Sequence, residues 1–345
     1  MKIDNKLVHK VAAIKKKATN SLASEAQTIQ NKFSKKIPFT PSRIFVSGFN
    51  NVTGKGAISL LYNDSWVPIF EDTGCYGIYF DTKHDILFGI TRINPQILAF
   101  KITKELEIEK IHINFKNYVF ANDAHGIVIV DDSLYVVASN GEDGSKKATN
   151  DDGPGKYVGK IIVSTLNFKE NSITVGNSKI YNPFNCSHHH HINDIVYFKN
   201  NFYISSFSYC NSDGNYIKKG TVSKIDLGKT GSVIIDELVH PHSLTHYNEQ
   251  LFVCSSKLSQ ILSFNFKKKD LKLEYKGIDA FVRGLLITDT FFYFGISYGI
   301  GRTGSNFNNP INGIFRFDRT TGETKKFPIP ENCNNIYSII ADPKS

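Results

Sequence analysis

The sequence has few cysteines and no long apolar run. Its five cysteines are an odd number and include no C-x-x-C pair, which favours reduced thiols over a disulfide framework. No stretch approaches the ~20 apolar residues that a membrane-spanning helix requires, and the N-terminus lacks the apolar core of a secretory signal. These absences predict a chain without a transmembrane segment, located in a reducing cytoplasm.

Sequence motifs of several large enzyme classes are missing as well. The chain contains no G-x-S-x-G nucleophile motif, no phosphate-binding P-loop and no dinucleotide-binding fingerprint. It therefore carries no signature of a serine hydrolase, a P-loop NTPase or a dinucleotide-dependent enzyme. Any chemistry has to come from residues that the fold brings together.

A charge excess that could bind nucleic acid is absent from most of the chain. The net charge is +9, but residues 1–41 hold nine lysines against Asp4 and Glu25. The remainder is close to neutral and has no arginine-rich segment and no nucleic-acid-binding motif. We therefore expect no nucleic-acid partner.

The same N-terminal residues are predicted to form a basic amphipathic helical arm and a linker. Apolar residues recur there at spacings of three or four, typical of one face of a helix of about 28 residues, and Pro38 and Pro41 end it. The apolar positions are Leu7, Val11, Ile14, Ala18, Leu22, Ala26, Ile29 and Phe33. Three roles stay open: the helix packs on the rest of the chain, it associates with a partner or a second copy, or it lies on a membrane surface.

What the chain does contain is a repeat. Six short stretches begin with a polar residue and a small residue and continue into alternating apolar residues. They open with Tyr76-Gly77, His125-Gly126, Asn193-Asp194, His242-Ser243, Arg283-Gly284 and Tyr337-Ser338. Their separations fit four-stranded blades with loops of variable length. Residues 42–345 are therefore predicted to form an all-β domain, a six-bladed β-propeller.

Both ends of this region look like incomplete blades. Three strand patterns, Arg43–Ser47, Ala57–Leu61 and Trp66–Phe70, precede the first repeat, whereas Ile336–Ala341 has no outer strands after it. Together they make one full blade. We predict that the N-terminal strands complete the C-terminal blade and close the ring, because closure removes unpaired sheet edges.

The propeller hypothesis predicts which side chains meet. The first strand of each blade lines the axis, so the polar residues that open the repeats face one another. Because residues two apart on a strand point the same way, a second layer lies above this ring. The ring holds Tyr76, His125, Asn193, His242, Arg283 and Tyr337, and the layer holds Gly74, Asp123, His191, His240, Phe281 and Asn335. The same rule points Asp194 into its blade.

Convergent imidazoles predict a metal site on the axis. His125, His191 and His242 come from three consecutive blades, and three imidazoles suffice for a metal with an open coordination position. Asn193 completes the predicted ligand set, and Asp123 either ligates the metal or holds a ligating histidine. The expected cofactor is a divalent transition metal: zinc, manganese or iron. The alternative is a polar plug, in which the histidines hydrogen-bond one another and water.

Five residues beside this site are candidates for catalytic roles: His240, Arg283, Tyr76, Tyr337 and Asp123. His240 can act as a general acid or base. Arg283 offers a planar guanidinium to a carboxylate, sulfate or phosphate, or else forms a salt bridge to an aspartate. The two tyrosines either donate protons or fill the channel.

Three blade starts resemble those of a known group of proteins. The stretches His191-Ile192-Asn193-Asp194-Ile195, Pro241-His242-Ser243-Leu244 and Val282-Arg283-Gly284-Leu285 are similar to the H-x-N-D-[IL], P-H-S and R-G-L motifs of a family of uncharacterised bacterial β-propellers. The likeness spans roughly residues 120–340 and leaves out the basic arm. It implies a propeller with a shared axial site and no settled activity.

Two classes of function are compatible with this pattern. The first is a metal-dependent enzyme of lyase or hydrolase type, which acts on a small anionic or saccharide-like substrate in the axial pocket. The second is a non-catalytic propeller that binds a small ligand or another protein. A histidine-rich ring differs from the Asn-, Asp- and Glu-lined mouth of six-bladed calcium lactonases, so calcium is not the expected ion.

Overall fold

The structure is a computed structural model. It describes residues 41–50, 53–91, 95–119, 123–139, 159–184, 190–208, 220–277, 280–297, 312–330 and 332–344. The predicted N-terminal helix lies outside these residues. Pro41–Ser345 is one compact unit. Within the described ranges, no helix has the length and apolar character needed to cross a membrane.

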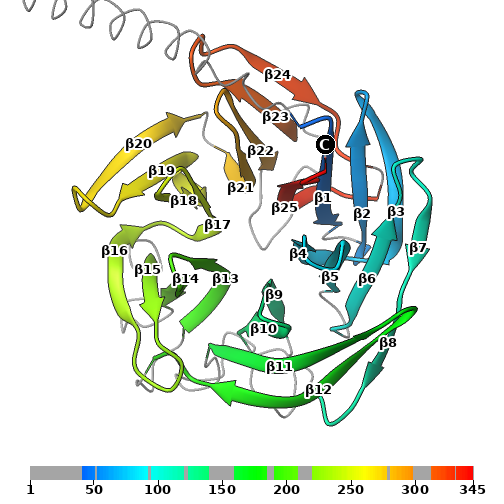
Figure 1. Cartoon of the computed structure of the whole chain (residues 1–345). Helices are drawn as coiled ribbons and strands as arrows, with labels where there is room; N and C mark the ends of the chain where they lie inside the picture. Colours follow the sequence, from blue (N-terminus) through cyan, green and yellow to red (C-terminus); the bar gives the residue numbers. More distant parts are fainter. Residues whose placement is uncertain are drawn as a thin grey trace, which may run out of the picture. The chain divides into compact units, whose positions relative to one another are not determined.

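The described residues form six sheets around a common axis, the six-bladed propeller that the repeat predicts (Figure 1). Each sheet places one strand at the axis and its last strand at the rim. The axial strands are β4 (Cys75–Asp81), β9 (Ala124–Val130), β13 (His190–Phe198), β17 (Pro241–Tyr247), β21 (Phe281–Ile287) and β25 (Asn335–Ala341). The second strands are β5 (Ile86–Thr91), β10 (Ser133–Ala138), β14 (Asn201–Ser208), β18 (Gln250–Ser255), β22 (Phe291–Ser297) and β1 (Arg43–Phe49).

The outer half of each sheet follows the same order. The third strands are β6 (Ile97–Ile102), β11 (Lys160–Lys169), β15 (Gly220–Ile225), β19 (Gln260–Asn265), β23 (Gly313–Asp318) and β2 (Lys55–Tyr62). The fourth strands are β7 (Ile108–Lys110), β12 (Ser172–Tyr181), β16 (Ser232–Leu238), β20 (Asp270–Lys276), β24 (Thr324–Phe327) and β3 (Ser65–Thr73). A short 3-10 helix, η2 (Ser256–Leu258), follows β18.

One sheet joins strands from the two ends of the described chain. Its order is β25-β1-β2-β3, and β25 pairs antiparallel with β1 through Phe45 and Ile340 and through Ile44 and Ala341. Arg43 and Asp342 form a buried ion pair beside this junction, at 3.1 Å between Nε and Oδ2.

Another sheet has one strand more than the repeat predicts. The strand β8 (His112–Phe115) follows β7 of the preceding blade and pairs parallel with β12, with Ser172 opposite His112. The chain between these blades therefore covers the outer edge of β12. Covering an edge shields unpaired backbone groups from other chains.

The second strands form the centre of the blades' packing. The five phenylalanines among the largest fully buried side chains are Phe45, Phe88, Phe252, Phe292 and Phe294. All five lie on second strands, which have sheet neighbours on both edges and other blades on both faces. Each such side chain contributes about 1.5–3 kcal/mol on burial, which explains why these strands read as nearly continuous apolar runs.

The axial strands share an irregularity that sequence parity does not show. In each of the six described axial strands the register to the second strand shifts by one residue at the level of the polar ring. In β13, for example, Ile192 pairs with Ser206 and Asp194 with Ser205, which leaves Asn193 as the extra residue. Such bulges re-aim side chains, so the alternation of faces changes after the ring.

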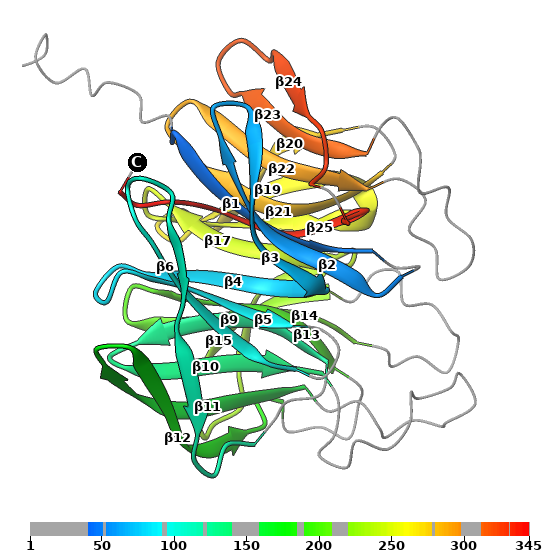
Figure 2. The same ribbon diagram turned by 90° about the vertical axis from the view of Figure 1, so that its right-hand side faces the viewer.

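Close approach of neighbouring axial strands explains the small residue of the repeat. A Cβ atom on Gly77 would lie 2.7 Å from the carbonyl oxygen of His125, and one on Gly126 would lie 3.0 Å from Cα of Asp194. The view from the side shows β4 and β9 next to each other (Figure 2). The blades are closest where the polar ring ends.

Candidate functional site

The six ring residues meet on the axis as the repeat predicts. Tyr76 stacks between two of the others, with ring centroids 4.8 Å from His125 and 4.3 Å from Tyr337. His125, Asn193, His242 and both tyrosines are buried. The aromatic rings therefore fill this level of the channel from one side.

Hydrogen bonds fix the tautomer of His125. Its Nδ1 lies 2.6 Å from the hydroxyl of Tyr337, and that hydroxyl donates to the carbonyl oxygen of Asn193 at 3.4 Å. Both bonds are satisfied when Nδ1–H donates to the Tyr337 oxygen. Burial raises the pKa of Tyr337 well above its usual value, and Asp194 adds to the effect, so the phenol stays protonated. The Nε2 atom of His125 then carries a lone pair.

A second pair, Arg283 and His242, occupies the other side of the ring. Nη2 of Arg283 lies 2.9 Å from Nε2 of His242, while Nδ1 of His242 lies 2.8 Å from the carbonyl oxygen of His240. A neutral imidazole with its proton on Nδ1 satisfies both contacts. Burial and the Arg283 charge lower the pKa of His242 well below its usual value. Its Nε2 lone pair is therefore already engaged by the guanidinium.

Above the ring, three residues bring metal-ligating atoms together. One ligand atom each from Asp123, His125 and His191 lies within 4.8 Å of the others. Nε2 of His125 is 3.2 Å from Oδ2 of Asp123, and Nδ1 of His191 is 4.0 Å from the same oxygen. We call these residues the Asp/His/His group. Among the described histidines, cysteines and acidic residues, His242 is not part of it.

The donors of the Asp/His/His group fit a cation. Nε2 of His125 is buried and makes no hydrogen bond within the described part of the chain. In the tautomer given above, its lone pair faces a carboxylate oxygen at 3.2 Å. Two such acceptors repel each other unless a proton or a metal ion lies between them. Two imidazoles and a carboxylate are a ligand set that divalent zinc and iron accept.

His240 lies on the far side of a phenylalanine from this group. The ring of Phe207 is 4.8 Å from His191 and 4.8 Å from His240, measured between centroids. On the other flank, Phe281 contacts the guanidinium of Arg283 at 4.6 Å. Phe207 therefore lies between His191 and His240, and Phe281 packs beside the pair of His242 and Arg283.

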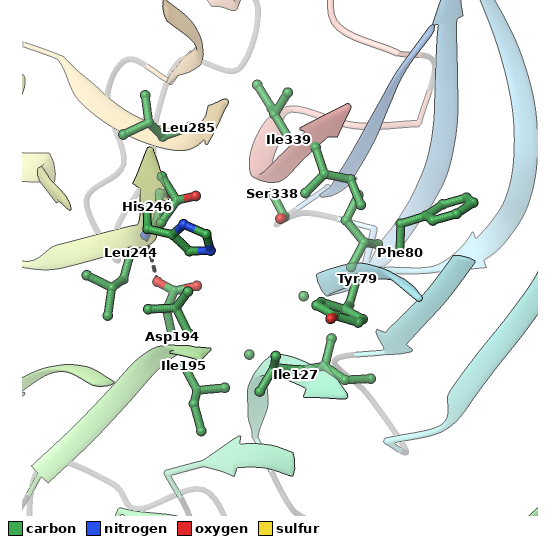
Figure 3. A pocket seen from close by; sticks show the side chains of 18 of the residues that line it. Tyr79, Phe80, Ile127, Asp194, Ile195, Leu244, His246, Leu285, Ser338 and Ile339 are labelled. Atoms are coloured by element: carbon green, nitrogen blue, oxygen red, sulfur yellow. Dashed lines mark hydrogen bonds between the residues drawn. The ribbon is translucent and has the colours of Figure 1, made fainter. Parts of the chain in front are cut away.

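The opposite end of the axis holds a cavity of about 280 Å³. Every axial strand contributes at least one aliphatic residue to its wall: Ile78, Ile127, Val128, Ile195, Val196, Leu244, Leu285, Ile339 and Ile340. Asp194, Ser243, His246, Ser338 and Tyr79 add polar groups. Figure 3 shows the carboxylate of Asp194 and the imidazole of His246 directed toward the middle of this cavity. We call it the Asp194 cavity.

Strand parity predicts that Asp194 points into its own blade. This prediction is wrong, because the bulge at Asn193 turns Asp194 toward the axis. Its Oδ2 accepts hydrogen bonds from the backbone N–H of Ser243 at 2.6 Å and from the hydroxyl of Ser205 at 3.4 Å. Burial raises the pKa of Asp194 to about 7, although these bonds and Arg283 act in the opposite direction.

Comparisons with known proteins concern the fold. No protein-family model matches the sequence, and no curated protein matches it. A chain in the crystal structure of a nidogen/laminin complex aligns over 86% of this chain and 97% of its own length, at 12% identity and a TM-score of 0.57. The protein is a β-propeller.

Two further solved structures align at lower TM-scores. A putative 6-phosphogluconolactonase from Bacteroides uniformis ATCC 8492 covers 82% of this chain and 81% of its own, at 10% identity and a TM-score of 0.47. The calcium-binding protein regucalcin from Agrobacterium tumefaciens covers 75% of each chain, at 10% identity and a TM-score of 0.46. At such identities a likeness carries nothing about function.

Sequence reasoning missed two features of the axis. Phe207 lies on a second strand, outside the repeat of the axial strands, so no signal marked it. The Asp194 cavity did leave a signal, because an aliphatic residue follows the small residue in all six repeats. Strand parity points those positions the same way as the ring residues, toward the axis, but the bulge that turns Asp194 inward could not be read from the sequence.

Proposed function

We propose that the protein is a metal-dependent enzyme of lyase or hydrolase type. It acts on a small anionic or saccharide-like substrate at the Asp/His/His group. The supporting observation is the buried Nε2 lone pair of His125, which faces a carboxylate oxygen of Asp123 at 3.2 Å. A zinc, manganese or iron ion held there would polarise a substrate carbonyl or lower the pKa of a bound water molecule.

The surrounding residues have distinct roles in this proposal. Asp123, His125 and His191 hold the ion, and Tyr337 orients His125 through the hydrogen bond to Nδ1. Such outer partners commonly fix the tautomer of a ligating histidine. Arg283 binds an anionic group of the substrate, because it carries a positive charge at the same end of the axis as the Asp/His/His group. Its guanidinium is held there against Phe281. His240 acts as the general acid or base.

The test is the metal content of the purified full-length protein, measured by elemental mass spectrometry without chelators or an affinity tag. We expect about one equivalent of a transition metal in the wild type and in His242→Ala, and none in His191→Ala. His242→Ala is a matched control, because it removes an equally central histidine whose Nε2 is engaged by Arg283. Metal loss in His242→Ala but not in His191→Ala would instead assign the ion to His240 and His242.

A non-catalytic binding propeller is the second candidate. The observation in its favour is that ring side chains satisfy one another: Arg283 with His242, His125 with Tyr337, and Nδ2 of Asn193 with the carbonyl oxygen of Pro241 at 2.6 Å. A polar plug behaves in this way. Absence of metal from a folded wild-type protein, together with an unchanged melting temperature in His191→Ala, would favour this candidate.

We also propose that the sheet β25-β1-β2-β3 is what closes the ring. The antiparallel pairing of β25 with β1 and the buried ion pair of Arg43 and Asp342 join the two ends of the chain. For the compartment we propose a reducing one, since Cys75, Cys254 and Cys333 are free thiols.

A further inference from the structure

The Asp194 cavity is chemically unlike the Asp/His/His group. Its wall is an aliphatic collar to which every axial strand contributes isoleucine, leucine or valine. Asp194 is the one acidic residue of the wall, and the wall has no lysine or arginine, as far as the described residues go. Burial lowers the pKa of His246, which faces the cavity from the rim. The cavity is therefore aliphatic, with one carboxylate as its charged group.

The carboxylate is held in place before any ligand arrives. Backbone N–H groups of Ser243 and Leu244 donate to it, and the Ser243 N–H and the Ser205 hydroxyl both donate to Oδ2. Figure 3 shows the other oxygen directed into the cavity. A fixed acceptor needs little reorganisation on binding, and this favours affinity.

We propose that the Asp194 cavity binds a small organic cation, a primary ammonium on a short aliphatic chain. The ammonium group forms a charge-assisted hydrogen bond with the open carboxylate oxygen of Asp194, and the alkyl chain lies within the aliphatic collar. The volume of about 280 Å³ lies just below the usual range for ligand pockets, which suits a small ligand. This proposal does not depend on the metal site.

Other ligand classes fit the wall less well. An anion would face the carboxylate with no cation of the wall to compensate for it. A calcium ion takes about six to eight oxygen ligands, whereas this wall is mainly aliphatic. A neutral apolar molecule would fill the collar but leave the carboxylate unpaired in a largely apolar cavity, and that is costly.

The test uses three probes of matched length: n-butylammonium, n-butanol and butyrate. Binding to the full-length protein is measured by isothermal titration calorimetry or ligand-observed NMR at pH 8. We expect saturable binding of n-butylammonium, with n-butanol at least about tenfold weaker, since a hydrogen bond to a charged group contributes about that factor. Butyrate should not bind. Equal affinity for the alcohol and the ammonium, or no saturable binding of the ammonium, would overturn the proposal.

Two variants and one control locate the bound probe. Asp194→Asn keeps the size of the side chain and should weaken n-butylammonium about tenfold or more. Ser338→Leu leaves Asp194 intact but fills the cavity, and should abolish binding. Asp131→Asn removes an exposed carboxylate outside the cavity wall and should change nothing. Folding of each variant is checked by its thermal transition; unchanged binding in folded Ser338→Leu would place the probe elsewhere.

Discussion

The two ends of the axis are built by the same six strands and differ sharply in chemistry. The end with the Asp/His/His group presents imidazoles, phenols and a guanidinium, whereas the Asp194 cavity presents aliphatic side chains and one carboxylate. Residues on either side of one bulge per strand supply the two surfaces. The extra residue in each axial strand changes which side chains face the axis. A single short strand can therefore supply residues to two different sites.

Burial dominates the charge state at both ends. Burial lowers the pKa of His242 and raises that of Asp194, in each case as the largest cause. Arg283 acts on both groups, because its charge lowers the pKa of each. Desolvation disfavours the charged form of either group, so burial shifts both groups toward their neutral forms.

The largest effect is expected from removal of the strand that the two ends share. β25 supplies Tyr337 to the polar ring and Ser338 and Ile339 to the Asp194 cavity. A chain shortened to residues 1–335 should lose its cooperative thermal transition and both binding activities. A chain ending at Asp342 keeps the ion pair with Arg43 and should stay folded. A folded, cooperative 1–335 chain would show that ring closure does not depend on β25.

A pH series on Asp194→Asn isolates the cavity end. With a folded pKa of about 7 and an ordinary value of 3.8, the folded wild type keeps a proton that the unfolded chain loses. The wild type should therefore lose stability relative to the variant as pH rises from about 4 to 7, by at most about 1.4 kcal/mol per pH unit, and no further above that. Urea unfolding at pH 5, 6, 7 and 8 measures this difference.

The control for that series is Asp131→Asn, which removes an exposed carboxylate. Its stability relative to the wild type should not show the same decline. A constant difference between the wild type and Asp194→Asn across the series would mean that Asp194 is ionised in the folded chain at pH 5.

The smallest effect is expected from two matched tyrosine variants. Tyr337→Phe removes the hydrogen bond to Nδ1 of His125 and should lower metal affinity by about tenfold, typical of the loss of such a supporting partner. Tyr79→Phe removes a hydroxyl that donates to the carbonyl oxygen of Ile129 at the cavity end and should leave metal affinity unchanged. Competition titrations with a chromophoric chelator compare them. Equal losses in both variants would indicate a general effect on folding.

Much of the architecture was accessible from the sequence, because the repeat has a clear period. The polar-then-small pattern of pairs such as His125-Gly126 predicted the axial strands and the residues that meet there. The pairing of β8 with β12 could not be predicted, since a four-residue strand at a blade edge has no counterpart in the other repeats. The bulge was hidden too, because it changes the direction of side chains without changing their apolar alternation.

The sequence predicted which residues lie at the candidate site better than it predicted which of them contact one another. Alternation predicted that His125, His191, His240 and His242 lie at one end, and they do. Sequence could not tell that Phe207, from a neighbouring strand, lies between His191 and His240. Nor could it tell that Arg283 engages Nε2 of His242. Which histidines share an ion depends on such side-chain contacts, and strand parity does not contain them.

The most direct measurement is a crystal structure of the full-length protein loaded with one equivalent of zinc, with an anomalous difference map at the zinc edge. The account predicts a single peak bonded to Asp123, His125 and His191, with Zn–N distances of about 2.0–2.1 Å, and no peak in the Asp194 cavity. A peak between His240 and His242, a peak at Asp194, or a map without a peak on the axis would contradict it.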